Sequence, residues 1–448
     1  MSILKAVRGT RDLLPPDTEL WNHIEATARR VFARYNFGEI RTPIFEDTSL
    51  FARGVGEETD IVSKEMYTWE DRARAQSEKA QSLTLRPENT AGVVRAYIEH
   101  GLGEAGLLQK LYYIGPQFRR ERPQRGRYRQ FYQIGAEVIG PPSAGSESPL
   151  RDAEVIEMLA AYLDELGIAG WALKINSVGS ASDRPRYVAA LREALREVAP
   201  KMCVDCRRRA ETNPLRVLDC KVPEDQPIID ALPKIADYLD EDSKAHFAAV
   251  CAGLDACLVA YEVTPRLVRG LDYYTRTTFE FTHGGLGAQN ALLGGGRYDG
   301  LSEMLGGPRA PGIGFAIGAD RLVLTLQAAA LESNTGEGKP VLADAYVAPL
   351  AEALAAEALK LARALRHAGL RIELGDGTFR LKKSFEMANK LARKIVLLGE
   401  NEVESGILTV KDFATGKQIK IPRAELEAVL SGALPASSAT LEGAAVDP

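Results

Sequence analysis

Residues 118–138 read FRRERPQRGRYRQFYQIGAEV, and the rest of the chain is best interpreted outward from them. The segment 119–129 contains six arginines and one glutamate, and Gly126 is a natural loop tip. Arginine is rarely buried without a partner, and its planar guanidinium group suits phosphate oxygens. Residues 127–138 alternate weakly, as a half-buried antiparallel strand does. We expect an arginine-rich loop leading into a strand, which is either an anion site for a triphosphate or RNA, or an exposed hairpin with surface ion pairs.

The flanking sequence predicts further strands and helices. Short apolar stretches at 83–86 and 111–114 are expected to be strands, with a helix from Thr90 to His100 between them. Residues 17–35 carry apolar side chains at spacings of three and four, which is typical of an amphipathic helix. EIRTPIFED at 39–47 predicts one strand. Pro43 favours a place for this strand at a sheet edge or an interface.

The pattern of elements changes along the chain and predicts several domains. We expect an α+β fold, in which an antiparallel sheet flanked by helices occupies residues 1–325. Residues 185–262 are helix-rich and hold all five cysteines, so we interpret them as an insertion. A polar linker is expected at 326–342. Strands and helices alternate over 343–430, which predicts a small α/β domain, and the Ala-, Ser- and Pro-rich residues 431–448 predict a disordered tail.

Composition limits the class of protein. The chain is 45% hydrophobic and 26% charged, which suits a globular protein with a sizeable core. A net charge of −5 argues against a protein that coats DNA, although local basic patches can still bind RNA. The sequence contains no run of about 18 apolar residues, so no membrane span is expected. The N-terminal sequence lacks a secretory signal pattern. We therefore expect a cytoplasmic protein with no membrane or DNA partner.

Three other stretches could bear chemistry, and each also has a structural interpretation. In RPENT at 86–90, a carboxylate and a hydroxyl lie two residues apart and could hold an ammonium group or cap a helix. VRGLDYYT at 268–275 could line a polar pocket or form a packed tyrosine corner. The glycine-rich stretches 294–299 and 312–321 permit close approach to a ligand, or simply tight turns, and match neither a dinucleotide fingerprint nor a P-loop.

The cysteines suggest, but do not establish, a metal site. Cys203, Cys206 and Cys220 could ligate zinc. A closed structural site needs four ligands, and no fourth Cys or His lies at a typical finger spacing. We therefore expect buried or free thiols and no bound metal.

Taken together, and in the order in which they occur along the chain, these sequence stretches resemble those of the class II aminoacyl-tRNA synthetases. Residues 118–138 resemble motif 2, RTPIFEDTSLF at 41–51 resembles motif 1, and GIGFAIGADRL at 312–322 resembles motif 3. LVRGLDYYTRTTFEF at 267–281 and GGGRYDGL at 294–301 resemble the two signatures of the histidyl-tRNA synthetase family. The resemblance covers nearly the whole chain and includes an anticodon-binding domain at its C-terminal end.

The resemblance implies an activity. A member of this family ligates L-histidine to tRNA(His) through histidyl-adenylate, consuming ATP and releasing AMP and pyrophosphate. It implies that Arg119 and Arg269 are catalytic cations at the α-phosphate, and that Glu121 and Arg321 also bind ATP. Mg²⁺ is expected to neutralise the phosphates. A homodimer formed through motif 1 is also implied.

The resemblance further implies the residues that bind histidine and tRNA. The side chains expected to bind histidine are Glu88, Thr90, Arg119, Gln133, Glu137, Arg269, Tyr273 and Tyr274. Glu137 and Tyr274 are expected to contact the two imidazole nitrogens, which would reject other amino acids without editing. The side chains expected to contact tRNA are Arg122, Arg125, Arg127, Lys382 and Lys383. Bacterial relatives commonly have glycine where Asn89 stands, so Asn89 is expected to cost a little if the backbone there is left-handed.

Three alternatives compete with this interpretation. The first is a catalytically inactive relative that serves as a regulatory subunit of ATP phosphoribosyltransferase. Such a protein is expected to lack the C-terminal domain and to have lost the arginines, which this chain retains. The others are a class II synthetase for proline, threonine or glycine, and an RNA-binding module without enzymatic activity.

Overall fold

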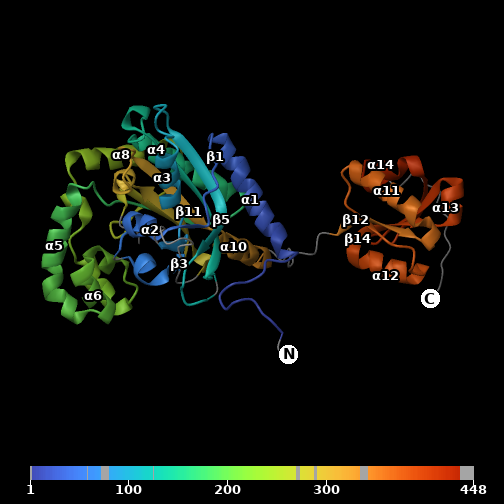
Figure 1. The fold of residues 1–448 in the computed structure, drawn as a ribbon, viewed down its shortest axis with the longest axis horizontal. Helices are drawn as coiled ribbons and strands as arrows, with labels where there is room; N and C mark the ends of the chain where they lie inside the picture. The colour runs from blue at the N-terminus through green and yellow to red at the C-terminus, as the bar shows by residue number, and fades with distance from the viewer. Residues whose placement is uncertain are drawn as a thin grey trace. The chain divides into compact units, whose positions relative to one another are not determined.

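The computed structural model describes residues 3–57, 59–71, 80–124, 126–268, 273–286, 290–332 and 342–433. The chain divides into two compact units, Met1–Gly338 and Lys339–Pro448 (Figure 1). Within the described residues, no helix combines the length and the apolar character needed to cross a membrane.

An eight-stranded sheet forms the centre of the first unit, in the order β1-β5-β6-β11-β10-β9-β7-β8. Its strands are β1 (Gly38–Glu39), β5 (Gln109–Phe118), β6 (Gln130–Ile139), β7 (Trp171–Ser177), β8 (Glu262–Val263), β9 (Thr275–His283), β10 (Ala291–Arg297) and β11 (Gly312–Gly318). The edge strands β1 and β8 pair in parallel with their neighbours, and the interior pairs are antiparallel. The sheet is therefore predominantly antiparallel, as predicted.

Strand β6 shows how the sequence separates the two faces of this sheet. Successive side chains on a strand point to opposite faces. Ile134 and Val138 belong to the main hydrophobic core. Phe131 and Gln133, at odd positions, line a cavity on the other face. The weak alternation in the sequence therefore corresponds to one apolar face and one polar face of the same strand.

Four helices contribute to the core on the apolar face of the sheet. They are α1 (Asp17–Arg34), α4 (Pro149–Glu165), α8 (Glu241–Ala256) and α10 (Ala319–Glu332). Helix α1 confirms the amphipathic pattern predicted for 17–35, since Ile24, Val31 and Phe32 are fully buried. Burying a side chain such as Phe32 contributes roughly 1.5–3 kcal/mol. This core fixes the sheet that carries the cavity on its other face.

The single strand predicted for 39–47 was wrong. The segment forms two short strands that belong to different sheets, namely β1 and β2 (Phe45–Asp47). Pro43, which lies between them, has no amide hydrogen and cannot donate to a strand ladder. Strand β2 joins β4 (Gln81–Leu85) and β3 (Tyr67–Asp71) in a three-stranded sheet.

Further helices of the first unit follow in chain order. They are α2 (Thr48–Val55), α3 (Thr90–Glu99), α5 (Asp183–Val198), α6 (Val204–Thr212), α7 (Gln226–Asp230) and α9 (Leu301–Met304). Helices α5, α6 and α7 lie within the stretch between β7 and β8, where helices were predicted. Helix α10 continues to Glu332, so it occupies the first part of the stretch that was expected to be a linker. Most of the expected tail, 434–448, lies outside the described residues.

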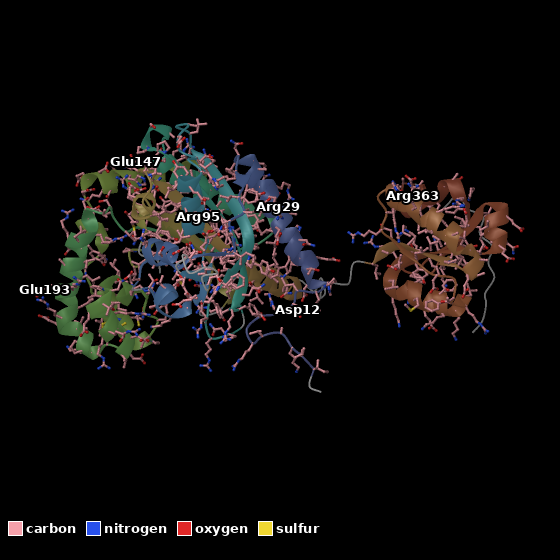
Figure 2. All side chains as sticks on the ribbon, viewed as in Figure 1. Asp12, Arg29, Arg95, Glu147, Glu193 and Arg363 are labelled. Atoms are coloured by element: carbon pink, nitrogen blue, oxygen red, sulfur yellow. The ribbon has the colours of Figure 1, made fainter. Side chains whose placement is uncertain are left out.

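The second unit is a small α/β fold around a five-stranded sheet in the order β13-β12-β14-β15-β16. Its strands are β12 (Ala343–Pro349), β13 (Ile372–Leu374), β14 (Ala392–Leu398), β15 (Ile407–Asp412) and β16 (Gln418–Pro422). Its helices are α11 (Ala355–His367), α12 (Leu381–Leu391), α13 (Glu400–Ser405) and α14 (Leu426–Leu430). Strands β15 and β16 are consecutive and pair antiparallel as a hairpin. Exposed charged side chains cover both units, for example Glu193 in the first and Arg363 in the second (Figure 2).

Candidate functional site

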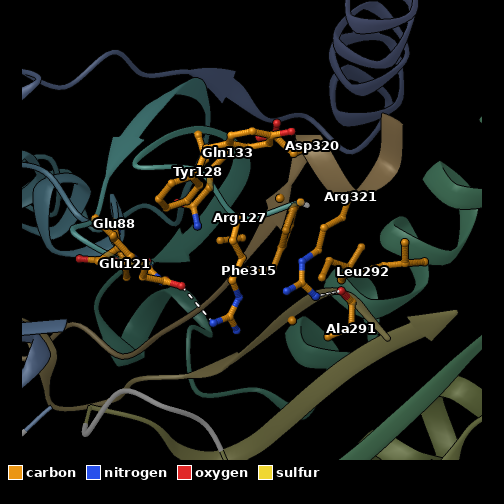
Figure 3. A pocket seen from close by; sticks show the side chains of 18 of the residues that line it. Glu88, Glu121, Arg127, Tyr128, Gln133, Ala291, Leu292, Phe315, Asp320 and Arg321 are labelled. Atoms are coloured by element: carbon orange, nitrogen blue, oxygen red, sulfur yellow. Dashed lines mark hydrogen bonds and ion pairs between the residues drawn. The ribbon is translucent and has the colours of Figure 1, made fainter. Parts of the chain in front are cut away.

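A cavity of about 270 Å³ lies on the polar face of the eight-stranded sheet (Figure 3). This size suits a small polar molecule or part of a larger one. The structure brings together nine of the residues that the sequence singled out for the site. They are Glu88, Thr90, Arg119, Glu121, Arg127, Gln133, Tyr273, Tyr274 and Arg321.

One edge of the cavity is built by the start of helix α3. The Glu88 carboxylate accepts hydrogen bonds from the amides of Thr90 (2.8 Å) and Ala91 (2.9 Å). The capping interpretation of this segment is therefore confirmed. The same carboxylate also lines the cavity, and its binding of an ammonium group stays a prediction. Burial raises the pKa of Glu88, although these hydrogen bonds oppose the shift. The φ of Asn89 is −121°, so this position does not need the left-handed backbone that glycine favours.

Glu137 lies beneath the cavity and does not line it. Its carboxyl group is fully buried and accepts hydrogen bonds from the hydroxyls of Thr90 (2.8 Å) and Tyr298 (2.7 Å). Burial raises its pKa to about 8, against the opposing effect of these two hydrogen bonds. The opposite residue on β11 is Gly314, where an added Cβ would lie 1.7 Å from a Glu137 oxygen. Glycine at 314 is therefore required, because the Glu137 carboxyl group occupies the space that a side chain at 314 would need.

Three tyrosines form a cluster next to this carboxyl group. The ring centroids of Tyr273 and Tyr274 are 4.8 Å apart, and those of Tyr273 and Tyr298 are 6.0 Å apart. All three side chains are buried, and Tyr273 and Tyr274 also line the cavity. The tyrosines are thus both packed and exposed to the site, so the two interpretations of this motif are compatible. Burial raises the pKa of Tyr273 and of Tyr298, which keeps their hydroxyls protonated.

Arginines from separate segments supply the positive charge of the cavity. Arg119, at the end of β5, donates from Nε to the Pro87 carbonyl at 2.9 Å and lies 5.2 Å from the Phe131 ring centre. Arg321, in the first turn of α10, donates to the Ala291 carbonyl (Figure 3). These anchors hold both guanidinium groups at the cavity, where they can meet an anionic ligand.

The arginine-rich loop contributes to the site through one ion pair. Arg127 and Glu121 both line the cavity, and their charged groups lie 3.0 Å apart (Figure 3). Arg122 is exposed and is not among the lining residues. Arg125, in the same loop, lies outside the described residues, as does the predicted catalytic cation Arg269.

The other predicted RNA contacts belong to the second unit. Lys382 and Lys383 are exposed on α12, and Lys383 lies 3.3 Å from Glu386. They face solvent, as a tRNA contact would require, but an ordinary charged surface would look the same.

Sequence reasoning missed several residues at the cavity. Asp320 lines it and forms an ion pair with Arg11 at 2.6 Å. The Arg11 guanidinium also lies 4.1 Å from the ring centre of Tyr128, another lining residue. Tyr298, which holds Glu137, was missed as well. Asp320 and Tyr298 lie within motifs already singled out, so the signal was present, but their partners are distant in sequence.

Arg297, within the GGGRYDGL motif, has a structural role. It is fully buried and bonds to the Asp152 carboxylate, with the shortest separation at 2.6 Å. It also pairs with Asp299 at 2.9 Å. This buried charge network joins the end of β10 to the start of α4, behind the cavity.

Both units match known protein families. Residues 9–322 match the histidyl-tRNA synthetase family. Residues 344–432 match an anticodon binding domain. The two matches together cover most of the chain and correspond to the two compact units.

Similar proteins agree with these matches along almost the full length. A histidine–tRNA ligase from Koribacter versatilis is 72% identical over 425 residues, which cover 95% of each chain. One from Solibacter usitatus is 57% identical and covers 96% of this chain and 100% of its own. The apo crystal structure of the Staphylococcus aureus histidyl-tRNA synthetase is 36% identical, with a TM-score of 0.75, over 96% of this chain and 99% of its own. The family match over residues 9–322 and the high identity to relatives along almost the full length show that the chain belongs to the histidyl-tRNA synthetase family.

Proposed function

We propose that the chain ligates L-histidine to tRNA(His) through a histidyl-adenylate intermediate, consuming ATP and releasing AMP and pyrophosphate. The observation that carries this proposal is that Arg119 and Arg321, about 200 residues apart in sequence, line one cavity together with Glu88, Thr90 and Gln133. Cations for a triphosphate thus lie beside carboxyl, hydroxyl and amide groups for an amino acid. The two relatives with the highest identities quoted above are both named histidine–tRNA ligases, which disfavours the regulatory-subunit alternative.

Negative charge develops on the transferring oxygens during adenylation, so fixed cations should provide much of the catalysis. Arg119 is the candidate for the α-phosphate, with Arg269 on its other side, and Arg321 for the adenine and γ-phosphate. Glu121 fits as a Mg²⁺ ligand, because this ion is usually held by one or two carboxylates together with substrate phosphates. Bound there, Mg²⁺ would neutralise phosphate charge.

The histidine subsite is proposed to lie between α3 and the tyrosine cluster. Among the described residues, Gln133 Oε1 is buried without a hydrogen-bond partner, and a buried acceptor normally has one. A substrate ammonium group would supply that partner beside Glu88 and Thr90. The imidazole would reach Tyr274 and the Glu137 carboxyl group, either directly or through the Thr90 hydroxyl.

The remaining partners follow from the family. The anticodon binding domain at 344–432 is the candidate to read the tRNA, with Lys382 and Lys383 on its surface. Arg122, Arg125 and Arg127 are proposed to approach the acceptor end. A homodimer and a cytoplasmic location complete the proposal.

Pyrophosphate exchange tests this function directly. Purified chain is incubated with ATP, labelled pyrophosphate and each of the twenty amino acids in turn. Exchange should occur with histidine alone, because the subsite rejects side chains that leave its buried polar groups unpaired. Exchange with proline, threonine or glycine would assign the chain to a different specificity. Absence of exchange with all twenty would return it to the regulatory class.

A further inference from the structure

We propose that Cys203, Cys206, Cys220 and Asp225 bind a structural Zn²⁺ ion. Only three cysteines have a suitable spacing in the sequence, and the expected absence of a metal rested on the lack of a fourth Cys or His. The fold supplies Asp225 as the fourth ligand. None of the four residues lines the cavity described above, and all four belong to the helical segment between β7 and β8.

The four ligands come from two short segments that the fold brings together. Cys203 is the N-cap residue of α6, and Cys206 lies in the first turn of that helix. Cys220 follows a short 3₁₀ turn at Pro214–Asp219, and Asp225 ends another at Pro223–Asp225. A Cys-x-x-Cys pair at a helix start, completed by ligands from a second segment, is a frequent arrangement in structural zinc sites.

The distances fit a metal better than a disulfide. The four ligand atoms all lie within 4.8 Å of one another. Zn–S bonds of about 2.3 Å at a tetrahedral angle place two sulfurs about 3.8 Å apart. The Sγ atoms of Cys203 and Cys220 are 3.9 Å apart, and Cys220 Sγ is 3.3 Å from Asp225 Oδ2. A disulfide requires about 2.05 Å, so the cluster has the spacing of ligands around a common centre.

The surroundings are arranged for anionic ligands. The Cys206 amide donates to Cys203 Sγ at 3.4 Å, and the Val222 amide donates to Cys220 Sγ at 3.4 Å. The Cys203 amide donates to both Asp225 oxygens, at 3.1 and 3.2 Å. The N-terminus of α6 adds a favourable dipole. Second-shell hydrogen bonds of this kind orient and stabilise metal ligands.

The cluster is largely buried, and its charge has no cationic partner in the part of the chain that the structure describes. Asp225 is 2% exposed, Cys206 is fully buried and Cys220 is 5% exposed. None of the ion pairs between described residues involves Asp225. A buried carboxylate is costly unless a charge or a metal compensates it. A divalent cation among three sulfurs and this carboxylate would satisfy the whole cluster.

The proposed ion would hold α6 in place relative to the rest of the first unit. Arg209 on α6 donates to the Arg216 carbonyl at 3.3 Å. Arg216 in turn pairs with Asp60, at 3.5 Å, outside the helical segment. An ion that joins the start of α6 to the segment around Cys220 would therefore also stabilise the Arg216–Asp60 ion pair. Asp60 lies shortly before β3 in the sequence.

Metal content and cobalt spectroscopy test the proposal on the full-length chain. Protein purified under reducing conditions should contain about one zinc per chain by elemental analysis. After zinc removal, added Co²⁺ should give thiolate-to-metal charge-transfer absorption and the intense visible bands of a tetrahedral site. Cys220→Ser should abolish both signals, and Asp225→Asn should weaken Co²⁺ binding at least about tenfold. The matched control is Cys257→Ser, because Cys257 is exposed and lies outside the cluster. This variant should behave like the wild type.

Three results would overturn the proposal. One is wild-type protein that carries no zinc and gives no charge-transfer band with Co²⁺. Another is a folded Cys220→Ser variant that binds Co²⁺ as tightly as Cys257→Ser. The third is a Cys203–Cys220 disulfide, detected by mass spectrometry, in freshly purified metal-free protein. If Cys220→Ser fails to fold, circular dichroism will show it, and the wild-type cobalt spectrum with Asp225→Asn still decides the question.

Discussion

Raising the pH should destabilise the first unit through Glu137, and replacing this residue with glutamine should remove the effect. The folded-state pKa is about 8, whereas an unfolded glutamate has a pKa of about 4.3. Because the folded pKa is the higher one, the stabilisation is complete below the unfolded pKa and is lost as the pH rises through 8. Each pH unit between these values removes about 1.4 kcal/mol. From pH 6 to 9 the loss is about 3 kcal/mol, and most of it occurs below pH 8.

Tryptophan fluorescence during urea unfolding measures this effect in the intact chain. Trp21, Trp69 and Trp171 are the three tryptophans of the sequence, and all lie in the first unit. Wild type and Glu137→Gln are compared at pH 6, 7, 8 and 9, at one protein concentration. Other groups titrate in both proteins, so the difference between the two curves isolates Glu137. Glutamine should gain about 2–3 kcal/mol relative to the wild type between pH 6 and 9.

Parallel curves for the two proteins would refute this reasoning. So would a wild type that gains stability relative to the variant at high pH, because a folded pKa above the unfolded pKa can only lower the stability as the pH rises. The same variant should lower kcat/KM for histidine at least about tenfold, because the amide replaces one of the two oxygens that accept from Thr90 and Tyr298 with an NH2 donor. The KM for ATP should change little. Equal effects on both substrates would give Glu137 a structural role only.

Arg269→Ala should reduce the rate of pyrophosphate exchange by about 10²–10³-fold, as for the loss of one transition-state donor, with an unchanged thermal unfolding midpoint; near-normal exchange would count against a catalytic role. Removing the charges of Lys382 and Lys383 together should weaken tRNA binding in filter-binding assays and reduce its dependence on salt concentration, and unchanged affinity would leave these lysines as ordinary surface. Arg297→Met should destabilise the first unit by about 3–5 kcal/mol in urea unfolding, because Asp152 is left as an unpaired buried charge; a loss under 1 kcal/mol would mean that Asp152 finds another partner or is protonated.

Local patterns predicted much of the fold. The spacing of apolar residues by three and four predicted α1, and the apolar stretch at 83–86 predicted β4. The alternation at 127–138 predicted β6. These predictions succeeded because each element is specified by side chains a few residues apart. The domain boundaries proposed from composition, including the insertion at 185–262, stay predictions.

Contacts between distant residues could not be derived from such patterns. Tyr298 meets Glu137 across 161 residues, and Asp320 meets Arg11 across 309. Asp225 has no metal-ligand spacing in the sequence and becomes a candidate ligand only through the turn that places it beside Cys220. The prediction of one strand at 39–47 was wrong for a related reason. The two ends of this segment pair with strands of two different sheets, and these partners are distant in sequence. The roles of Arg119 and Arg321 were assigned through the family resemblance, and the cavity adds their proximity.

Charging of tRNA(His) with labelled histidine tests the central claim most directly. The full-length chain is incubated with ATP, Mg²⁺, labelled histidine and a tRNA(His) transcript, and acid-precipitated radioactivity is followed over time. Label should accumulate on this tRNA only when all components are present, and should be absent when a different tRNA or a different amino acid is supplied. Protein that binds histidine and ATP but transfers no label to tRNA(His) would contradict the account.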